Sequence, residues 1–263
     1  MSTIALSPLD LAFAASLLAI NAAISWGFGL RLERSIAVAA ARMVVQLALI
    51  GLVLKFIFGP VWTLALVLVM AGAAGVEVVT RQHRRLKGRQ ALGLSSATLL
   101  FIGVAITSLG VGVIIGPEPW YAPRYVLPIL GMVLGNAMTA MSLVLDTFCE
   151  TVTRERASIE ARLALGAQRR EAMSGALRTS LRTGTTPILN SMATTGIVAL
   201  PGMMTGQILA GADPLEAVKY QILIMFLIAA ATALAAFFGG LGALLLLTDR
   251  RHRLRLERLA AAR

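Results

Sequence analysis

The stretch "TPILNSMATTGIVALPGMMTGQILAG" (residues 186–211) is apolar enough to lie in a membrane, yet it holds two prolines, four threonines, an asparagine, a serine and a glutamine. Proline removes a backbone donor and clashes with the preceding turn of a helix. We therefore expect a transmembrane segment that is interrupted at Pro201 and Gly202, which would act as a hinge. Its polar side chains need protein partners or water, because lipid cannot hydrogen-bond them.

The rest of the chain has the composition of a membrane protein. Of its 263 residues, 57% are hydrophobic and only 14% are charged, whereas soluble proteins average about 25% charged residues. A helix needs about 20 apolar residues to cross a bilayer. We expect an all-α, multi-pass protein with a single transmembrane domain over residues 1–263. The expected spans are seven: 9–30, 35–58, 61–79, 96–115, 125–145, 187–211 and 217–247.

Basic residues cluster between these spans. Segments 31–34, 80–95, 146–186 and 248–263 hold 20 of the 24 Lys and Arg residues. Because cytoplasmic loops are rich in Lys and Arg, we predict that the N-terminus is outside and the C-terminus inside. The net charge of +11 therefore reflects membrane topology rather than nucleic-acid binding. One cysteine and two histidines exclude an intramolecular disulfide and argue against a zinc site.

The predicted cytoplasmic segment 146–186 contains "IEARLALGA" (residues 159–167), which reads as a short helix ended by Gly166. One interpretation is a surface helix attracted to anionic membrane lipid through its arginines. The other is a docking helix for a cytoplasmic partner. The spacing of Glu160, Ala161 and Gly166 resembles the EAA loop of ABC-transporter permeases, whose helix fits a cleft on the ATP-binding subunit.

Two further stretches strengthen this resemblance: "LPILGMVLGNAMTAMSLVLDTF" (residues 127–148) and "PILNSMATTGIVALPGMMTGQILAGADPLEAVKYQI" (residues 187–222). With them the chain resembles the permease family of the bacterial iron exporter FetB, which includes plant permeases associated with aluminium tolerance. The resemblance implies an iron or related metal exporter of the inner (plasma) membrane. It also implies a permease homodimer that pairs with two copies of a separate ATP-binding subunit.

The chain itself contains no G-x-x-x-x-G-K-[ST] phosphate loop. We therefore expect it to be no enzyme and to hold no cofactor, with ATP and Mg²⁺ bound by the partner subunit. An intramembrane enzyme is disfavoured because the spans lack a histidine and an acidic pair. Two alternatives stay open: an ABC permease for an organic solute, and a secondary transporter that works without an ATPase.

Polar residues in the spans are the candidates for a translocation pathway. At about 100° per residue, Asn190, Ser191, Thr194 and Thr195 share one helix face, and such a face normally meets a pathway, a helix contact or a dimer interface. The candidate pathway residues are Asn136, Asn190, Ser191, Thr194, Thr195 and Gln207. In the fifth span, Gly131, Gly135, Thr139 and Ser142 share a face that predicts close helix packing.

Charged residues are rare in the spans. Arg42 and Glu77 lie near the same end of adjacent antiparallel spans, and we predict an intramembrane ion pair, with a substrate or gate charge as the alternative. Six of the eleven methionines lie in the two stretches quoted above. We interpret them as packing residues rather than Cu(I) ligands. The spans offer almost no carboxylate or imidazole, so we assign no metal-ligating residue.

Overall fold

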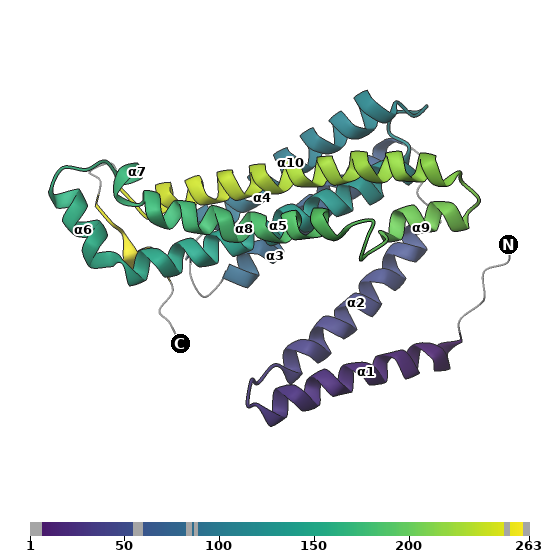
Figure 1. Cartoon of the computed structure of the whole chain (residues 1–263), viewed down its shortest axis with the longest axis horizontal. Coiled ribbons are helices and arrows are strands. Elements are labelled where there is room, and N and C mark those ends of the chain that lie inside the picture. The colour runs from purple at the N-terminus through teal and green to yellow at the C-terminus, as the bar shows by residue number, and fades with distance from the viewer. Residues whose placement is uncertain (1–6, 55–59, 83–85, 87–88, 250–252, 260–263) are drawn as a thin grey trace. The chain divides into compact units, whose positions relative to one another are not determined.

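The computed structural model describes residues 7–54, 60–82, 86, 89–249 and 253–259, which form helices (Figure 1) and no strand beyond two isolated bridges. The α-helices are α1 (Pro8–Gly27), α2 (Glu33–Leu54), α3 (Pro60–Gln82), α4 (Arg89–Ser108), α5 (Pro123–Arg154), α6 (Arg156–Ala164), α7 (Arg169–Ala172), α8 (Ser174–Thr194), α9 (Gly202–Leu209) and α10 (Pro214–Leu246). A π-helix, η1 (Leu109–Ile115), continues α4, and a 3₁₀ turn, η2 (Leu256–Arg258), follows α10.

Five helical segments within these residues are long and apolar enough to cross a membrane: Leu9–Gly27, Glu33–Leu52, Gln90–Ile115, Pro123–Arg154 and Pro214–Leu246. The apolar part of α3, Trp62–Val78, is shorter. The chain is thus an all-helical, multi-pass membrane protein. The count of seven spans and the orientation of the termini stay predictions.

The segment predicted as one span over 187–211 is two helices instead. α8 begins at Ser174, thirteen residues before Pro187, and ends at Thr194, and α9 begins at Gly202. The early start has a packing cause, because Ala176, Ser180 and Gly184 are buried along one face of α8. The expected interruption is therefore present, but it begins before Pro201.

The chain divides into two compact units, Met1–Phe58 and Gly59–Arg263. In the first unit, α1 and α2 form a hairpin. Ser25 ties its turn together, because its Oγ donates to Glu33 Oε1 at 2.8 Å and accepts from the Leu32 N–H at 2.9 Å. The prediction of a single domain over 1–263 is not tested by this division.

In the second unit, α5 and α10 form the core. α5 packs against α3, α4, α8 and α10, and α10 also packs against α4, α8 and α9. Glycines allow the closest of these contacts. A Cβ on Gly239 of α10 would lie 3.0 Å from Met141 Cγ of α5, and one on Gly240 would lie 2.8 Å from Leu177 Cδ1 of α8. The core therefore depends on small residues at helix crossings, as is common in membrane proteins.

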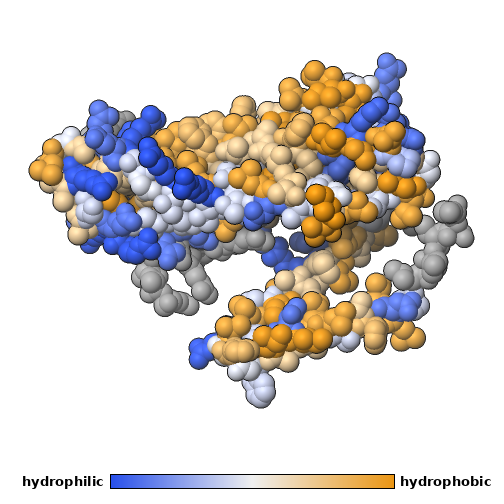
Figure 2. Space-filling model, in the orientation of Figure 1, coloured by the Kyte–Doolittle hydropathy of each residue, from blue (hydrophilic) through white to orange (hydrophobic). Residues whose placement is uncertain are grey.

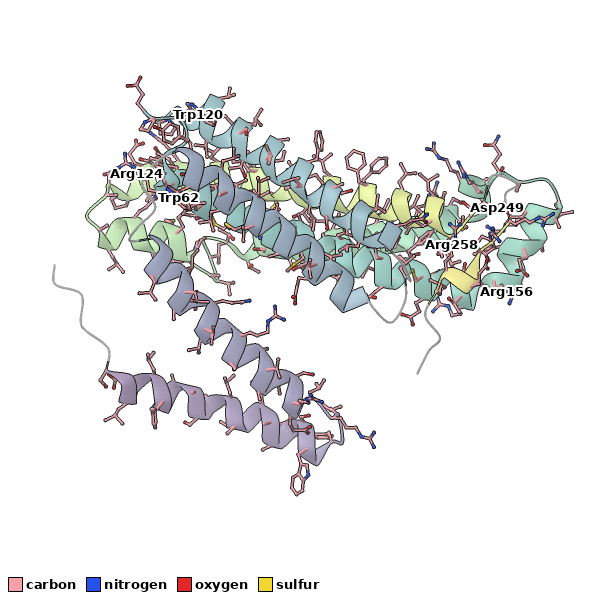
Figure 3. The ribbon with its side chains drawn as sticks, turned by 180° about the vertical axis from the view of Figure 1, so that it is seen from behind. Trp62, Trp120, Arg124, Arg156, Asp249 and Arg258 are labelled. Atoms are coloured by element: carbon pink, nitrogen blue, oxygen red, sulfur yellow. The ribbon has the colours of Figure 1, made fainter. Side chains whose placement is uncertain are left out.

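The two ends of the second unit differ in their exposed side chains. One end, which we call the arginine end, comprises α6, α7 and the chain after α10, and it carries Arg156, Asp249 and Arg258 (Figure 3). The other, which we call the tryptophan end, carries Trp62, Trp120 and Arg124 (Figure 3). Figure 2 shows hydrophilic surface gathered over α6, α7 and the start of α8, and mainly apolar surface along α10.

Candidate functional site

The predicted docking helix is α6, at the arginine end. Ile159 is only 2% exposed and anchors the helix to the core, with Leu163 partly buried one turn later. Glu160 and Ala161 face outward and are exposed. Arg156 Nε donates to Glu160 Oε1 at 2.8 Å across one helical turn, and both side chains stay about half exposed. An exposed pair of this kind adds little stability, so Glu160 remains available to a partner.

Gly166 ends α6 as predicted. Its φ is +93°, a conformation that favours glycine. The Ala167 N–H donates to Arg162 O at 3.0 Å and the Gly166 N–H donates to Leu163 O at 3.1 Å, which is the Schellman arrangement. This turn leaves the preceding Leu165 side chain 88% exposed.

Leu165 is a residue that sequence reasoning missed. Leu165 is an exposed apolar side chain beside charged residues of α6, and protein interfaces likewise combine an apolar centre with a polar rim. The sequence signal was its position directly before a helix-ending glycine. Together, Glu160, Ala161, Leu165 and Gly166 form what we call the α6 surface.

The chain after α10 also belongs to the arginine end. Arg258 Nη1 donates to Leu246 O at 2.6 Å, and the Asp249 N–H donates to Arg253 O at 3.1 Å. A cation at a helix C-terminus is favourable for the helix dipole. The predicted basic tail 248–263 therefore folds back, in its described part, onto the end of α10.

The second candidate region is a group of exposed polar residues on α5 and α8, which we call the polar strip: Asn136, Thr139, Asn190, Ser191 and Thr194. α5 and α8 run antiparallel, and Gly184 fixes their register, because its Cβ position lies 2.9 Å from Ala140 O. Asn190 follows Gly184 by six residues and Asn136 precedes Ala140 by four. At about 1.5 Å per residue, Asn136 and Asn190 therefore lie at a similar height along the pair.

Hydrogen bonds within each helix already satisfy part of the strip. The hydroxyls of Thr194 and Thr195 donate to the carbonyls of Asn190 and Ser191, at 3.0 and 2.7 Å. Asn136 Nδ2 donates to Met132 O at 2.9 Å. No such bond is found for the Asn190 or Ser191 side chains within the part of the chain that the structure describes. Those two side chains thus need water or a partner most.

The G-x-x-x-G pattern predicted close helix packing at Gly131 and Gly135, and α5 shows none there within the second unit. A Cβ on Gly135 would meet nothing within 4 Å, and one on Gly131 would meet only Met70 Cε at 3.5 Å. Thr139 is exposed, whereas Ser142 is buried. α8 contacts the adjacent face of α5 instead, at Ala140 and Val144. The face around Gly135 and Thr139 is therefore open within the second unit.

The interruption between α8 and α9 is a tight turn. Thr195 leaves the helix, Gly196 adopts a φ of +91°, and the Gly196 N–H donates to Ala199 O at 2.9 Å. Pro201 is the N-cap of α9 and Gly202 its first residue, so the proline restarts a helix rather than bending one. Gln207 is half-buried on α9, which packs against α10. Whether Pro201 and Gly202 act as a hinge stays a prediction.

Arg42 and Glu77 lie in different units, so the predicted ion pair between them stays a prediction. The methionines behave as packing residues. Met141 is fully buried, and Met132, Met138, Met192 and Met203 pack against the core. Among the described residues, no three His, Cys, Asp or Glu side chains come together as a metal cluster.

Comparison with known proteins identifies relatives along almost the whole chain. The sequence profile of UPF0014, described as an uncharacterised protein family, matches residues 8–244. The probable iron export permease protein FetB of Escherichia coli is 34% identical over 230 residues, covering 88% of each chain. No solved structure matches significantly.

Two plant proteins are similarly related. UPF0014 membrane protein STAR2 of Oryza sativa is 35% identical, over 86% of this chain and 78% of the relative. Protein ALUMINUM SENSITIVE 3 of Arabidopsis thaliana is also 35% identical, over 80% of this chain and 76% of the relative.

Proposed function

Because the chain belongs to the UPF0014 family of membrane proteins, we propose that it is the permease subunit of an ATP-driven exporter of iron or a related metal. The name of the Escherichia coli relative supports the substrate and the direction. In this proposal a separate ATP-binding subunit, present in two copies, binds ATP and Mg²⁺. The complex lies in the inner (plasma) membrane with the arginine end in the cytoplasm.

The observation that carries the coupling part of this proposal is the α6 surface. It combines a buried anchor at Ile159 with exposed Glu160 and Leu165 and a glycine-fixed turn. α6 packs against the core on one side and is exposed on the other. Movement of a partner bound to its exposed side can therefore be transmitted to α5 and α8.

The polar strip supports a permease homodimer. Polar side chains that face lipid are costly, because lipid cannot satisfy them. A second copy placed against α5 and α8 would cover Gly135 and enclose Asn136, Asn190 and Ser191 between the two chains. The pathway would then run along the dimer axis, with the turn at 195–201 near its end.

The scarcity of carboxylates and imidazoles near the strip favours weak, transient contact with the metal. Hard ions such as iron prefer oxygen and imidazole ligands, whereas thioethers suit softer ions. An exporter must also release its cargo, so a tight metal cage would slow it. We therefore place the passing ion among amide and hydroxyl oxygens rather than methionine sulfurs.

Metal content tests the substrate. Deleting the gene should raise cellular iron and peroxide sensitivity, and the wild-type chain should restore both. Met203→Leu and Met204→Leu should restore them equally well, because thioethers prefer softer ions than iron. The readout is iron and copper by mass spectrometry. Unchanged iron in the deletion strain would remove iron as the substrate, and a copper rise that only the methionine-containing chain reverses would replace it.

A further inference from the structure

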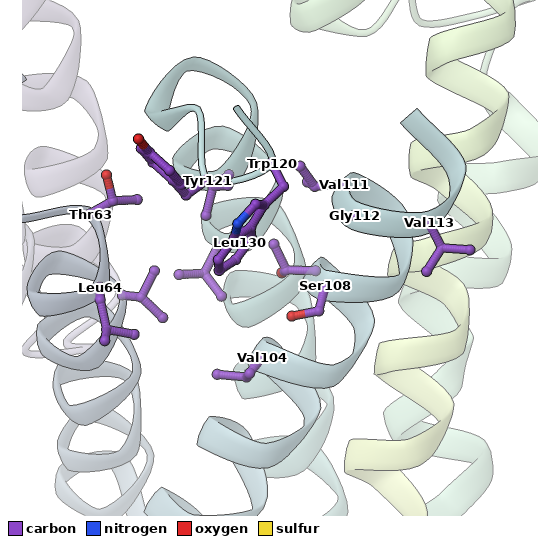
Figure 4. A pocket seen from close by; sticks show the side chains of 13 residues that line it. Thr63, Leu64, Val104, Ser108, Val111, Gly112, Val113, Trp120, Tyr121 and Leu130 are labelled. Atoms are coloured by element: carbon purple, nitrogen blue, oxygen red, sulfur yellow. The ribbon is translucent and has the colours of Figure 1, made fainter. Parts of the chain in front are cut away.

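A cavity of about 630 Å³ lies among α3, α4, η1 and the first turns of α5, towards the tryptophan end (Figure 4). Its walls are mostly apolar, and they include Leu64 and Val67 of α3, Val104 of α4 and Leu130 of α5. The π-helix contributes Val111 and Gly112. π-helical turns are rare and often mark functional sites, and the volume is that of a typical small-ligand pocket.

One polar group in this cavity lacks a partner. Thr107 is only 5% exposed and lines the cavity, and its Oγ1 forms no hydrogen bond within the described part of the chain. Several threonines in the helices described above donate to the carbonyl four residues earlier, whereas the buried Thr107 and Thr232 do not. A buried hydroxyl without a partner is destabilising. An acceptor oxygen on a bound molecule would satisfy it.

The mouth of the cavity has the character of a membrane interface. Trp120 and Tyr121 line it, and their rings meet edge to face at 5.7 Å. Trp62 and Arg124 lie at the same end of the unit (Figure 3). Tryptophan and tyrosine concentrate at the level of lipid headgroups. The exposed Arg124 guanidinium lies 5.0 Å from the centre of the Tyr125 ring. This contact holds the guanidinium, a group that can bind phosphate, at the tryptophan end.

We propose that this cavity binds one acyl chain of a membrane glycerophospholipid. From the inside outward, the cavity presents an apolar wall at Val104 and a hydroxyl donor at Thr107, and Arg124 lies at the same end of the unit, four residues after the lining Trp120. A glycerophospholipid has the matching order of acyl chain, ester carbonyl and phosphate. The Thr107 hydroxyl donates to the ester carbonyl, and Arg124 binds the phosphate. This site depends on the membrane location of the chain and not on the proposed transport.

Quenching of Trp120 fluorescence tests the site. The full chain carrying Trp26→Phe and Trp62→Phe retains Trp120 alone, and it is titrated in detergent with phosphatidylglycerol brominated on one acyl chain. We expect saturable quenching with one lipid per chain. Val104→Phe, which fills the cavity, should weaken binding about tenfold. Val76→Phe on α3, an exposed valine outside the cavity, is the matched control and should bind normally.

The polar contacts have separate tests. Thr107→Val keeps the side-chain shape and should weaken binding of the phospholipid but not of a brominated alkane of the same chain length, which has no acceptor oxygen. Arg124→Gln should weaken phosphatidylglycerol binding severalfold. The proposal is overturned if quenching does not saturate, if Val104→Phe and Val76→Phe bind alike, or if the alkane binds as tightly as the phospholipid.

Discussion

Neighbouring helices are joined differently at the arginine end and at the tryptophan end of the second unit. At the arginine end, α5 and α8 are connected through two short, anchored helices whose exposed side chains are mostly charged. At the tryptophan end, the helices break, and Ile197, Val198 and Leu200 are exposed apolar side chains in the turn. Charged ends suit water and protein partners, whereas apolar turns suit lipid or a second membrane subunit.

α8 connects these two environments, and its two halves differ accordingly. The half near the arginine end is buried at Ala176, Ser180 and Gly184. The other half exposes Asn190, Ser191 and Thr194. α8 therefore contributes both to the packing of the second unit and to the candidate pathway. Substitutions along α8 should therefore separate stability from transport.

The largest effect is expected at Gly184. Leucine there would collide with Val144 and with Ala140 O, and overpacking of this kind costs about 3 kcal/mol or more. Gly184→Leu should fail to accumulate or should melt far below the wild type in detergent. Gly135→Leu on α5 is the matched control, because its Cβ position is open. It should melt like the wild type and yet lower transport by blocking the strip. Equal melting of the two variants would contradict the packing described for α5 and α8.

A smaller but specific effect is expected at Leu165. Leu165→Asp should leave stability unchanged because the side chain is 88% exposed, and it should weaken capture of the proposed ATP-binding subunit, co-expressed with the chain, about tenfold. Glu160→Ala should act in the same direction. Leu215→Asp, at the start of α10 and also exposed, is the control. If Leu165→Asp and Leu215→Asp retain the subunit equally, the α6 surface is not its docking site.

The smallest effect is a difference in labelling between neighbours. In a Cys149→Ser background, cysteine at Asn190 should react with a water-soluble thiol reagent faster than cysteine at Leu189, and nucleotide should change its rate. Cys149 is the one cysteine of the chain, so its replacement leaves no other thiol to react. Asn190 belongs to the polar strip, while Leu189 is an exposed apolar side chain that we expect to face lipid. Equal rates at both positions would argue for a dry helix contact along the strip.

The sequence predicted features that depend on local chemistry. Gly166 was expected to end α6, and it does so because a left-handed residue is needed there. Polar residues were expected on one face of the segment after Pro187, and Asn190, Ser191 and Thr194 share the exposed part of α8. Features that depend on tertiary packing were not predictable. Nothing local marks Gly184 as the contact with α5, or Gly135 as an open position.

The limits of α8 show the same distinction. Proline suggested that a helix would begin at Pro187 and break at Pro201, but burial of Ala176, Ser180 and Gly184 extends the helix backwards through Pro187. Gly196, with its positive φ, ends the segment earlier than the proline could. Composition therefore located the interruption to within a few residues, and packing decided its position.

The threonines along α8 give its surface a definite hydrogen-bonding polarity. The hydroxyls of Thr183, Thr185, Thr186, Thr194 and Thr195 each donate to a carbonyl four residues earlier. Their hydrogens point back into the helix, so what they offer outward is oxygen lone pairs. A hydrated cation can donate its water hydrogens to such a surface, whereas an anion finds no hydroxyl donor there. If α8 lines the proposed pathway, we expect these five threonine hydroxyls to favour hydrated cations over anions without carrying any charge themselves.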